Sequence, residues 1–323
     1  MEFIKKLMRQ REFMIFMIVA GMFVIMSFAS PYFLNRGNLL ALLLGLSLES
    51  LIAVAMTNLM ASGGFDMSVG SVVAFTGAAV AMLMKLGCPI PLAVLAGLCV
   101  GASAGVFNGF TVAIIGINPF VTTLASLSLF RGLTLIITQG KNIAPLPSSF
   151  NIIGQAKILG IQSPIWITVI FFILGDIMLR RSRFFRQNYF IGGNEKTARL
   201  SGIPVNKMKV FNYMLTGLFA GFAGIILTAR LGAASVTTGT GLELKVITAV
   251  IIGGASLAGG EGTVLGAFFG SLLMALIVNA LTLLGVDVYW QTFVIGATLL
   301  IAVLIDRFGK IRRDRLSMRK AGA

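Results

Sequence analysis

The sequence predicts an all-α polytopic membrane protein with about ten transmembrane helices. Of its 323 residues, 57% are hydrophobic and only 11% are charged, whereas a soluble domain carries about 25% charged residues. Apolar stretches close to the ~20 residues that cross a bilayer recur from Phe13 to Asp306. The chain also holds 38 glycines, and small residues allow membrane helices to approach closely.

We expect ten spans that follow the apolar runs in order. The first run comes after basic residues, as in a signal peptide, but it is longer than the ~7–15 apolar residues of such a segment, so we expect it to remain as an anchor. The longest loop expected on the outer side, 139–163, could hold a short surface helix or lie against a partner. The spans are expected at residues 13–30, 39–60, 67–86, 92–114, 119–138, 164–180, 210–230, 244–260, 263–285 and 288–306.

Basic residues gather outside these spans, in the N-terminus, the loop 181–209 and the tail 307–323. Basic loops remain in the cytoplasm, and even numbers of expected spans separate the three segments. Eight spans would satisfy the same parity. We therefore expect one domain, 1–323, with a membrane bundle over 13–306 and both termini in the cytoplasm. A net charge of +15 distributed in this way indicates no nucleic-acid partner and fits contact with membrane lipid.

Two glycine-rich segments interrupt the apolar runs. They read ASGGFDMSVGS from Ala61 and IIGGASLAGGEGTVLG from Ile251. Non-helical backbone at membrane depth persists only where it is buried in protein or lines a cavity, and paired interruptions of this kind indicate a transport site. A fainter similarity, between NGFTVAIIGINPF from Asn108 and NALTLLGVDVYWQ from Asn279, suggests a duplicated half.

Polar side chains in or beside the spans are candidates for a translocation path, because charges inside a membrane are costly and usually face the bundle interior. A structural role is the alternative for each of them. Glu49 and Arg131 could form a buried pair, and Asp66 or Ser68 could cap the helix that follows. The polar candidates are Glu49, Asn58, Asp66, Asn108, Asn118, Arg131, Asn279 and Gln291, and Phe65 is added because it lies next to the first glycine interruption.

Residues 192–207, GGNEKTARLSGIPVNK, form a polar stretch in the basic loop. Asn194 suits the N-cap of a helix, and Glu195 and Arg199 match the helix dipole in the first and last turns. Gly202 suits the left-handed position after a helix. The pattern predicts a two-turn helix from Asn194 to the residue before Gly202. So short a helix is marginal alone in water, so we expect it to dock on lipid head groups or on a partner protein.

Four motifs together resemble the ribose-type permease subunits of bacterial ABC sugar importers. They are ASGGFDMSVGS, NPFVTTLASLSLFRG, GGNEKTARLSGIPVNKMKV and VIIGGASLAGGEGTVLGAFFG, and they follow the family order between about residues 38 and 306. The resemblance implies an ABC importer permease bundle in the bacterial inner membrane. It also implies a homodimer or a pair with a paralogous permease, an ABC ATPase that docks from the cytoplasm, and a periplasmic or lipid-anchored sugar-binding protein.

The resemblance further implies that the polar stretch is the coupling helix that contacts the ATPase. The residues implied for this contact are Gly192, Gly193, Asn194, Glu195, Ala198, Arg199 and Gly202. The implied function is the translocation of a monosaccharide, a ribose-like pentose, a hexose or a related polyol, into the cytoplasm. Asn58 and Phe65 depart from the residues usual in the family, so the substrate can differ from ribose.

The chain has no G-x-x-x-x-G-K-[ST] pattern, so we expect no ATP site of that type on it. We therefore expect a transport subunit rather than an enzyme, with no catalytic residues, no metal and no cofactor, and with ATP and Mg on the partner ATPase. An alternative is an ion-coupled secondary transporter that works without an ATPase and uses Glu49, Asp66 or Asp176 as proton carriers. A membrane enzyme is disfavoured because there is no histidine and no cluster of metal ligands.

Overall fold

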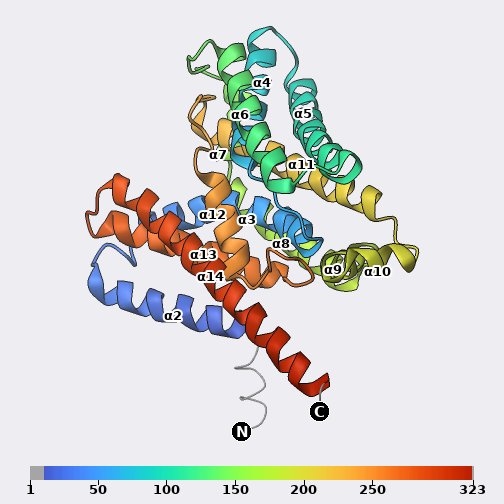
Figure 1. Ribbon diagram of the computed structural model, residues 1–323. Coiled ribbons are helices and arrows are strands. Elements are labelled where there is room, and N and C mark those ends of the chain that lie inside the picture. Colours follow the sequence, from blue (N-terminus) through green and yellow to red (C-terminus); the bar gives the residue numbers. More distant parts are fainter. Residues whose placement is uncertain (1–10, 322–323) are drawn as a thin grey trace.

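The computed structural model describes residues 11–321, with the side chains of residues 12–308, and the described chain is mostly helical (Figure 1). The expected basic residues of the N-terminus before residue 11 lie outside the described residues. The elements are α2 (Arg11–Ala29), α3 (Arg36–Ala61), α4 (Val69–Lys85), α5 (Ile90–Phe110), η1 (Thr111–Ile115), α6 (Pro119–Thr138), α7 (Ser148–Gln155), β1 (Lys157–Ile158), β2 (Ile161–Gln162), α8 (Ser163–Arg181), α9 (Arg183–Gly193), α10 (Glu195–Leu200), α11 (Val205–Leu231), α12 (Leu242–Ile252), α13 (Val264–Leu283) and α14 (Val288–Ala321).

Each expected span contains a helix, and eight helices in the described chain are long and apolar enough to cross a membrane. The two shorter ones are α4, whose 17 residues extend ~25 Å, and α12, whose 11 residues extend ~16 Å. The expected span 244–260 is therefore too long. Its helix ends at Ile252, because the following backbone turns at glycines such as Gly254, with a φ of +99°.

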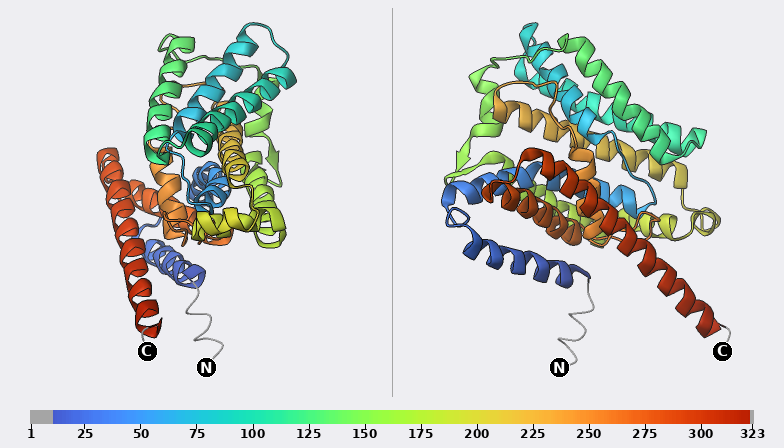
Figure 2. Two further views of the ribbon diagram at one scale, coloured as in Figure 1. Left: turned by 45° about the vertical axis from the view of Figure 1, so that its right-hand side comes forward. Right: turned by 60° about the vertical axis from the view of Figure 1, so that its left-hand side comes forward.

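The centre of the bundle is α3, in which every residue from 46 to 61 is buried. The helices α4, α5 and α6 lie on one side of α3, and α2, α13 and α14 lie on the other (Figure 2). The partly enclosed α11 packs against α3, α4 and α5. Few residues of the spans α2, α8 and α14 are buried, as in helices that face lipid.

Glycines bring α5 and α11 into backbone contact. A Cβ at Gly101 would lie 2.6 Å from the carbonyl oxygen of Gly217, and one at Gly217 would lie 2.7 Å from the backbone nitrogen of Gly105. Real Cβ atoms do not approach other atoms so closely, so only glycine fits at these positions. The four-residue spacing along α5 is the small-residue pattern of closely packed membrane helices.

The loop 139–163 contains the short surface helix that the sequence suggested, α7, followed by a small hairpin. In the hairpin Lys157 pairs with Gln162 and Ile158 with Ile161. At the other end of the chain, α14 runs without a break through the membrane segment and into the basic tail, up to Ala321.

Candidate functional site

The predicted helix of the polar stretch is confirmed: it is α10, which lies outside the candidate spans beside α9 (Figure 1). The Asn194 side chain accepts a hydrogen bond from the N–H of Thr197 at 3.0 Å. At the other end Gly202 has a φ of +79°, and its N–H donates to the carbonyl oxygen of Arg199 at 3.0 Å. Ile203 donates to the carbonyl oxygen of Ala198 at 3.1 Å. The two bonds together form the Schellman motif that glycine at this position favours.

The inner face of α10 docks on the chain itself. Ala198 is 2% exposed and packs with Ile191 of α9 and with Val205 and Met208 at the start of α11. This contact explains how a helix of six residues can persist, since helices of this length do not hold by themselves. Part of the surface on which we expected α10 to dock is therefore formed by α9 and α11 of the same chain.

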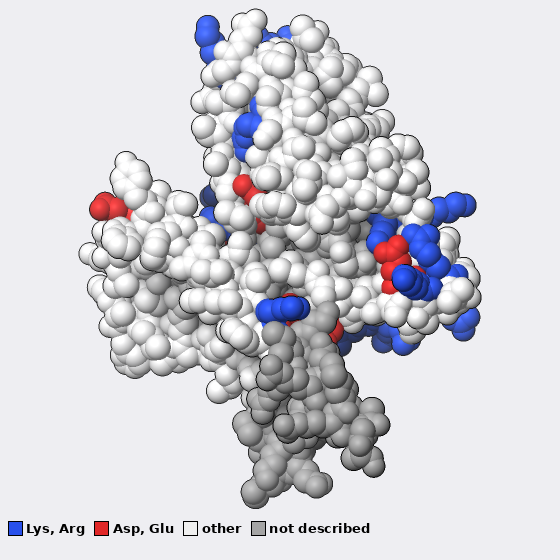
Figure 3. Space-filling model, in the orientation of Figure 1, with Lys and Arg blue, Asp and Glu red and all other residues white. Residues whose placement is uncertain are grey.

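Charged side chains also tie α10 to α11. Oε1 of Glu195 accepts from Nη2 of Arg199 at 2.7 Å, and Oε2 accepts from Nζ of Lys209 at 2.6 Å. Arg199 also donates to Oδ1 of Asn206 at 2.6 Å. Partial burial acts to raise the pKa of Glu195, but the bonds from Lys209 and Arg199 and their positive charges outweigh it, so the pKa lies below its usual value. Figure 3 shows acidic and basic side chains gathered in this region.

The outer face of α10 presents Leu200, which is 90% exposed. This leucine lies outside the candidate spans and is therefore available for contact with a partner. The residues implied by the sequence resemblance omit Leu200. Helix geometry offered a signal for Leu200. Side chains two positions apart point about 200° apart around a helix axis, so Leu200, two positions after the buried Ala198, points to the opposite side.

Gly192 and Gly193, which the sequence treats together, have different surroundings. A Cβ on Gly192 would overlap the carbonyl oxygen of Ala61 and the backbone nitrogen of Gly260. A Cβ on Gly193 would meet nothing within 4 Å. Gly192 therefore faces the glycine-interrupted segments of the bundle, whereas Gly193 is free to face a partner.

Asp66 lies in a fully bonded polar network. Its Oδ1 accepts from the backbone N–H of Ser68 at 2.7 Å and from the hydroxyl of Ser68 at 2.6 Å, and its Oδ2 accepts from Nδ2 of Asn108 at 3.1 Å. The hydroxyl of Ser126 donates to the amide oxygen of Asn108. Asp66 and Asn108 are 1% and 0% exposed. The network joins the start of α4 to α5 and α6, an arrangement that favours a structural role.

Phe65 precedes Asp66 in the segment between α3 and α4, and Asn118 lies at the start of α6. The ring of Phe65 packs against that of Phe120, with centroids 6.4 Å apart, and its carbonyl oxygen accepts from the hydroxyl of Tyr213 at 3.2 Å. Asn118 is exposed and caps α6, because its side chain accepts from the N–H of Phe120 at 2.9 Å.

Asn58 belongs to a closed ring of three buried amides. Nδ2 of Asn58 donates to Oδ1 of Asn212 at 2.8 Å, Asn212 donates to Asn188 at 2.8 Å, and Asn188 donates back to Asn58 at 2.6 Å. The ring connects α3, α9 and α11. The sequence gave no signal for Asn188 and Asn212, because only the tertiary fold brings the three side chains together.

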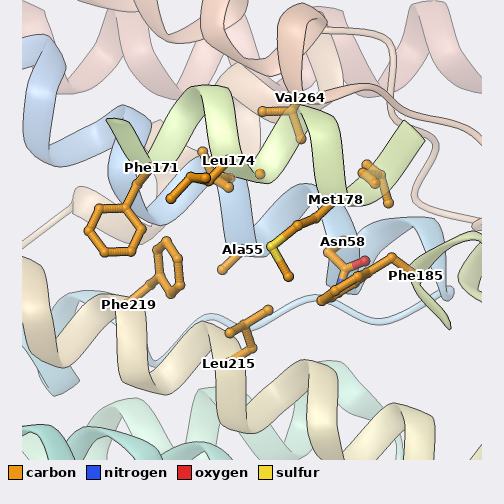
Figure 4. Close-up of a pocket in the computed structure, with 12 residues that line it drawn as sticks. Ala55, Asn58, Phe171, Leu174, Met178, Phe185, Leu215, Phe219 and Val264 are labelled. Atoms are coloured by element: carbon orange, nitrogen blue, oxygen red, sulfur yellow. The ribbon is translucent and has the colours of Figure 1, made fainter. Parts of the chain in front are cut away.

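Asn58 also borders an apolar cavity of about 220 Å³ between α3, α8 and α11 (Figure 4). Asn58 is the one polar side chain in its lining. Sugar sites need several convergent polar groups, so this cavity is poorly suited to a sugar. The other residues of the lining are Val54, Ala55, Phe171, Leu174, Gly175, Met178, Leu179, Phe185, Leu215, Phe219 and Val264.

Glu49 and Arg131 do not form the buried pair that the sequence suggested. Oε1 of Glu49 lies 3.6 Å from Nζ of Lys245 in α12. Nη1 of Arg131 donates to the carbonyl oxygens of Val236 and Thr238 at 2.7 and 2.9 Å. The suggestion was wrong because α3 packs against α12, whereas α6 packs against α4.

Asn279 and Gln291 lie apart from the groups above. Nδ2 of Asn279 donates to Oδ1 of Asn38 at 2.7 Å, and Nε2 of Gln291 donates to the hydroxyl of Thr282 at 3.2 Å. The predicted path residues thus fall into separate clusters, and their part in a path stays a prediction. In the described chain, no group of three or more His, Cys, Asp or Glu side chains is placed to hold a metal ion.

Comparison with known proteins gives consistent matches over most of the chain. A family model described as "Branched-chain amino acid transport system / permease component" matches residues 38–303. The ribose import permease protein RbsC of Escherichia coli (strain K12) is 40% identical over 304 residues, which cover 93% of this chain and 94% of that protein. RbsC of Bacillus subtilis (strain 168) is 41% identical, covering 88% and 89%. The L-arabinose transport system permease protein AraH of Escherichia coli (strain K12) is 37% identical, covering 90% and 89%.

One solved structure, PsaBC from Streptococcus pneumoniae in complex with Fab, is similar in fold. The TM-score is 0.50 at 17% sequence identity, and the match covers 87% of this chain and 98% of that one. At this identity the similarity concerns the fold alone.

Proposed function

From the premise that this chain belongs to the branched-chain amino acid transport permease family, we propose that it is the membrane-spanning subunit of an ATP-driven ABC importer for a monosaccharide. The chain is a multi-pass membrane permease, a transport component rather than an enzyme. Relatives that match about nine tenths of it are named for ribose and L-arabinose. They support a ribose-like pentose, a hexose or a related polyol as substrate.

The proposal assigns ATP and Mg to a partner ATPase and no cofactor to this chain. The observation that carries the coupling is α10: it lies outside the spans, its inner face docks on α9 and α11, and its outer face leaves Leu200 90% exposed. A helix presented in this way fits a contact with a second protein. We infer that this face docks on the ATPase.

Motion of the ATPase would reach the bundle through contacts of this chain. α10 packs against the end of α9, and Gly192 at that end touches the backbone of both glycine-interrupted segments. Packed interfaces move as rigid bodies between discrete arrangements, so a shift of α10 would displace these segments together. This would open the path alternately to the two sides of the membrane.

The remaining partners follow from the same proposal. A periplasmic or lipid-anchored sugar-binding protein would deliver the substrate, and a second permease, identical or paralogous, would complete the pore. The basic residues of the loop and tail support a cytoplasmic position for α10 and both termini, with the bundle in the bacterial inner membrane.

Reconstitution into proteoliposomes tests this function. The tagged chain is purified with its ATPase from cells that produce it, and uptake of labelled ribose and L-arabinose is measured with and without ATP and the binding protein. We expect uptake that requires ATP and the ATPase. Uptake by this chain alone, driven by a proton or sodium gradient, would contradict the importer and support a secondary transporter.

A further inference from the structure

A charged contact crosses the interior of the bundle between α3 and α12. Glu49 lies midway along α3, and Lys245 lies in the first turn of α12. Oε1 of Glu49 and Nζ of Lys245 are 3.6 Å apart, and Glu49 is only 8% exposed. Ionisable groups inside membrane bundles are rare, and they commonly mark substrate or ion pathways.

Both members of this contact keep unused hydrogen-bonding capacity. Oε2 of Glu49 is buried and has no hydrogen-bond partner among the described residues. The Lys245 ammonium carries three hydrogen-bond donors. Its Nζ lies 3.6 Å from Oε1 of Glu49, which is beyond ordinary hydrogen-bond length. A buried acceptor that lacks a partner destabilises the fold. A pair with a purely structural role would therefore be expected to form direct hydrogen bonds.

Asp66 shows what a structural carboxylate looks like in the same bundle. It is 1% exposed, and its two oxygens accept three hydrogen bonds from Ser68 and Asn108. Glu49 is buried almost as deeply and accepts none at Oε2. Glu49 therefore keeps an acceptor that a water molecule or a ligand can satisfy.

The position of the contact suits a transported molecule. The contact lies on the two helices that lead into the glycine interruptions, but at a distance from the interruptions themselves, at the middle of α3 and in the first turn of α12. Interrupted helices commonly form transport sites. The side chain of Lys245 is 27% exposed, so the contact can be reached from the lysine side. A carboxylate next to an ammonium has no net charge, which favours a neutral ligand over an anion or a cation.

Building on the function proposed above, we propose that Glu49 and Lys245 bind the hydroxyl groups of a neutral, polyhydroxylated substrate as it passes between α3 and α12. Oε2 of Glu49 is enclosed in the present arrangement, so it accepts a hydrogen bond from a hydroxyl once α3 and α12 separate, and a neighbouring hydroxyl then reaches Oε1. The ammonium of Lys245 donates to a hydroxyl or ring oxygen. Hydroxyls carry both a donor and an acceptor, so one sugar satisfies both side chains.

A charge-swap experiment separates this role from a structural one. Glu49→Gln, Lys245→Met and the double variant Glu49→Lys with Lys245→Glu are compared with Asp176→Asn, which alters an ion pair nearer the surface. We expect each single variant to lower the ATP-driven uptake rate at saturating sugar by at least about tenfold, and Asp176→Asn to leave it unchanged. The swap should restore the thermal unfolding midpoint but not the uptake. A swap that restores both would show that the pair only packs the helices, and would overturn the proposal.

A binding measurement keeps the inference independent of transport. The thermal unfolding midpoint of the purified permease–ATPase complex is followed with ribose, L-arabinose and deoxy analogues that lack one hydroxyl. We expect removal of a particular hydroxyl to weaken stabilisation in the wild type but to have no further effect in Glu49→Gln, since the two changes remove one interaction. Equal stabilisation of the wild type and Glu49→Gln by every sugar, or stabilisation of neither, would overturn the site. Absence of ATP-driven uptake by the wild type would instead contradict the proposed function.

Discussion

The backbone N–H of Gly260 donates a 2.9 Å hydrogen bond to the carbonyl oxygen of Ala61 and joins the two glycine-interrupted segments of the chain. Gly192, from the end of α9, lies directly against both atoms of this bond. A Cβ on Gly259 would lie 2.7 Å from the Cα of Gly192. Three motifs that are far apart in the sequence therefore meet through their backbones, next to the helix that we propose contacts the ATPase.

We expect Gly192→Ala to lower the uptake rate and the thermal unfolding midpoint, while the ATPase still co-purifies. Alanine normally stabilises a helix relative to glycine, but here its methyl group would separate Gly260 from Ala61, and such overpacking costs about 1–3 kcal/mol. Gly21→Ala, at a glycine of α2, is the matched control, because a Cβ there would meet nothing within 4 Å. Uptake assays that give the same result for both variants would contradict a role of the Gly192 contact in coupling.

The sequence predicts features that depend on local signals. Apolar runs located the helix in each expected span, and the residues around Asn194 and Gly202 located both ends of α10. These signals are strong because hydropathy over ~20 residues and cap chemistry need no tertiary information. The length of α12 was overestimated because alanine and leucine continue the apolar pattern past Ile252, while the glycines that stop the helix are also common inside membrane helices.

The clusters within the bundle could not be predicted in this way. The sequence suggested that Glu49 could pair with Arg131, whereas Glu49 lies next to Lys245, because the sequence does not say which helices are neighbours. The partners of Asn58 in the amide ring come from α9 and α11, more than a hundred residues away. Such contacts depend on the packing of helices rather than on the pattern along one of them.

The amide ring gives a stability prediction. Asn188→Ala should lower the free energy of unfolding by about 1–3 kcal/mol, because it leaves buried groups of Asn58 and Asn212 without partners. Asn58→Ala in the Asn188→Ala background should add less than it does alone, since the two residues share one network. Thermal or denaturant unfolding in detergent measures both effects. Strictly additive losses would show that the ring does not act as a unit.

We expect Leu200→Ser to reduce the amount of ATPase that co-purifies, with little change in the thermal unfolding midpoint. Leu200 is 90% exposed, and exposed side chains away from special features contribute within about ±0.5 kcal/mol to folding. Lys196→Ser, at another exposed position of α10, serves as the control. Charge reversals at Glu195 or Arg199 are a poorer test of docking, because these residues bond to each other. Unchanged co-purification of Leu200→Ser would argue against this face as the docking surface.

The attachment of α10 should weaken in acid. The pKa of Glu195 is lowered in the folded chain, so its stabilising bonds are fully present above its ordinary pKa, near 4.5, and are lost as the pH falls through the lower folded value. A spin label at Leu200→Cys, with Cys88 and Cys99 replaced by alanine, would report increased motion over this acidic range. Glu195→Gln should be mobile already at neutral pH and show no such transition. A label whose motion does not depend on pH in the otherwise unchanged chain would refute the attachment by charge.

Gly202 offers the cleanest test of how the end of α10 is held. Its φ is +79°, and nothing lies within 4 Å of a Cβ built there, so a substitution is opposed by backbone conformation and not by lack of space. Valine is β-branched and resists positive φ, at a cost of about 1–2 kcal/mol, whereas asparagine adopts this conformation readily. We expect Gly202→Val to loosen the turn between α10 and α11 and to reduce both ATPase co-purification and uptake, while Gly202→Asn retains most of both. If both variants lose the same amount of co-purified ATPase and the same share of uptake, the added side chain itself disturbs the contact. The left-handed turn is then not what positions α10.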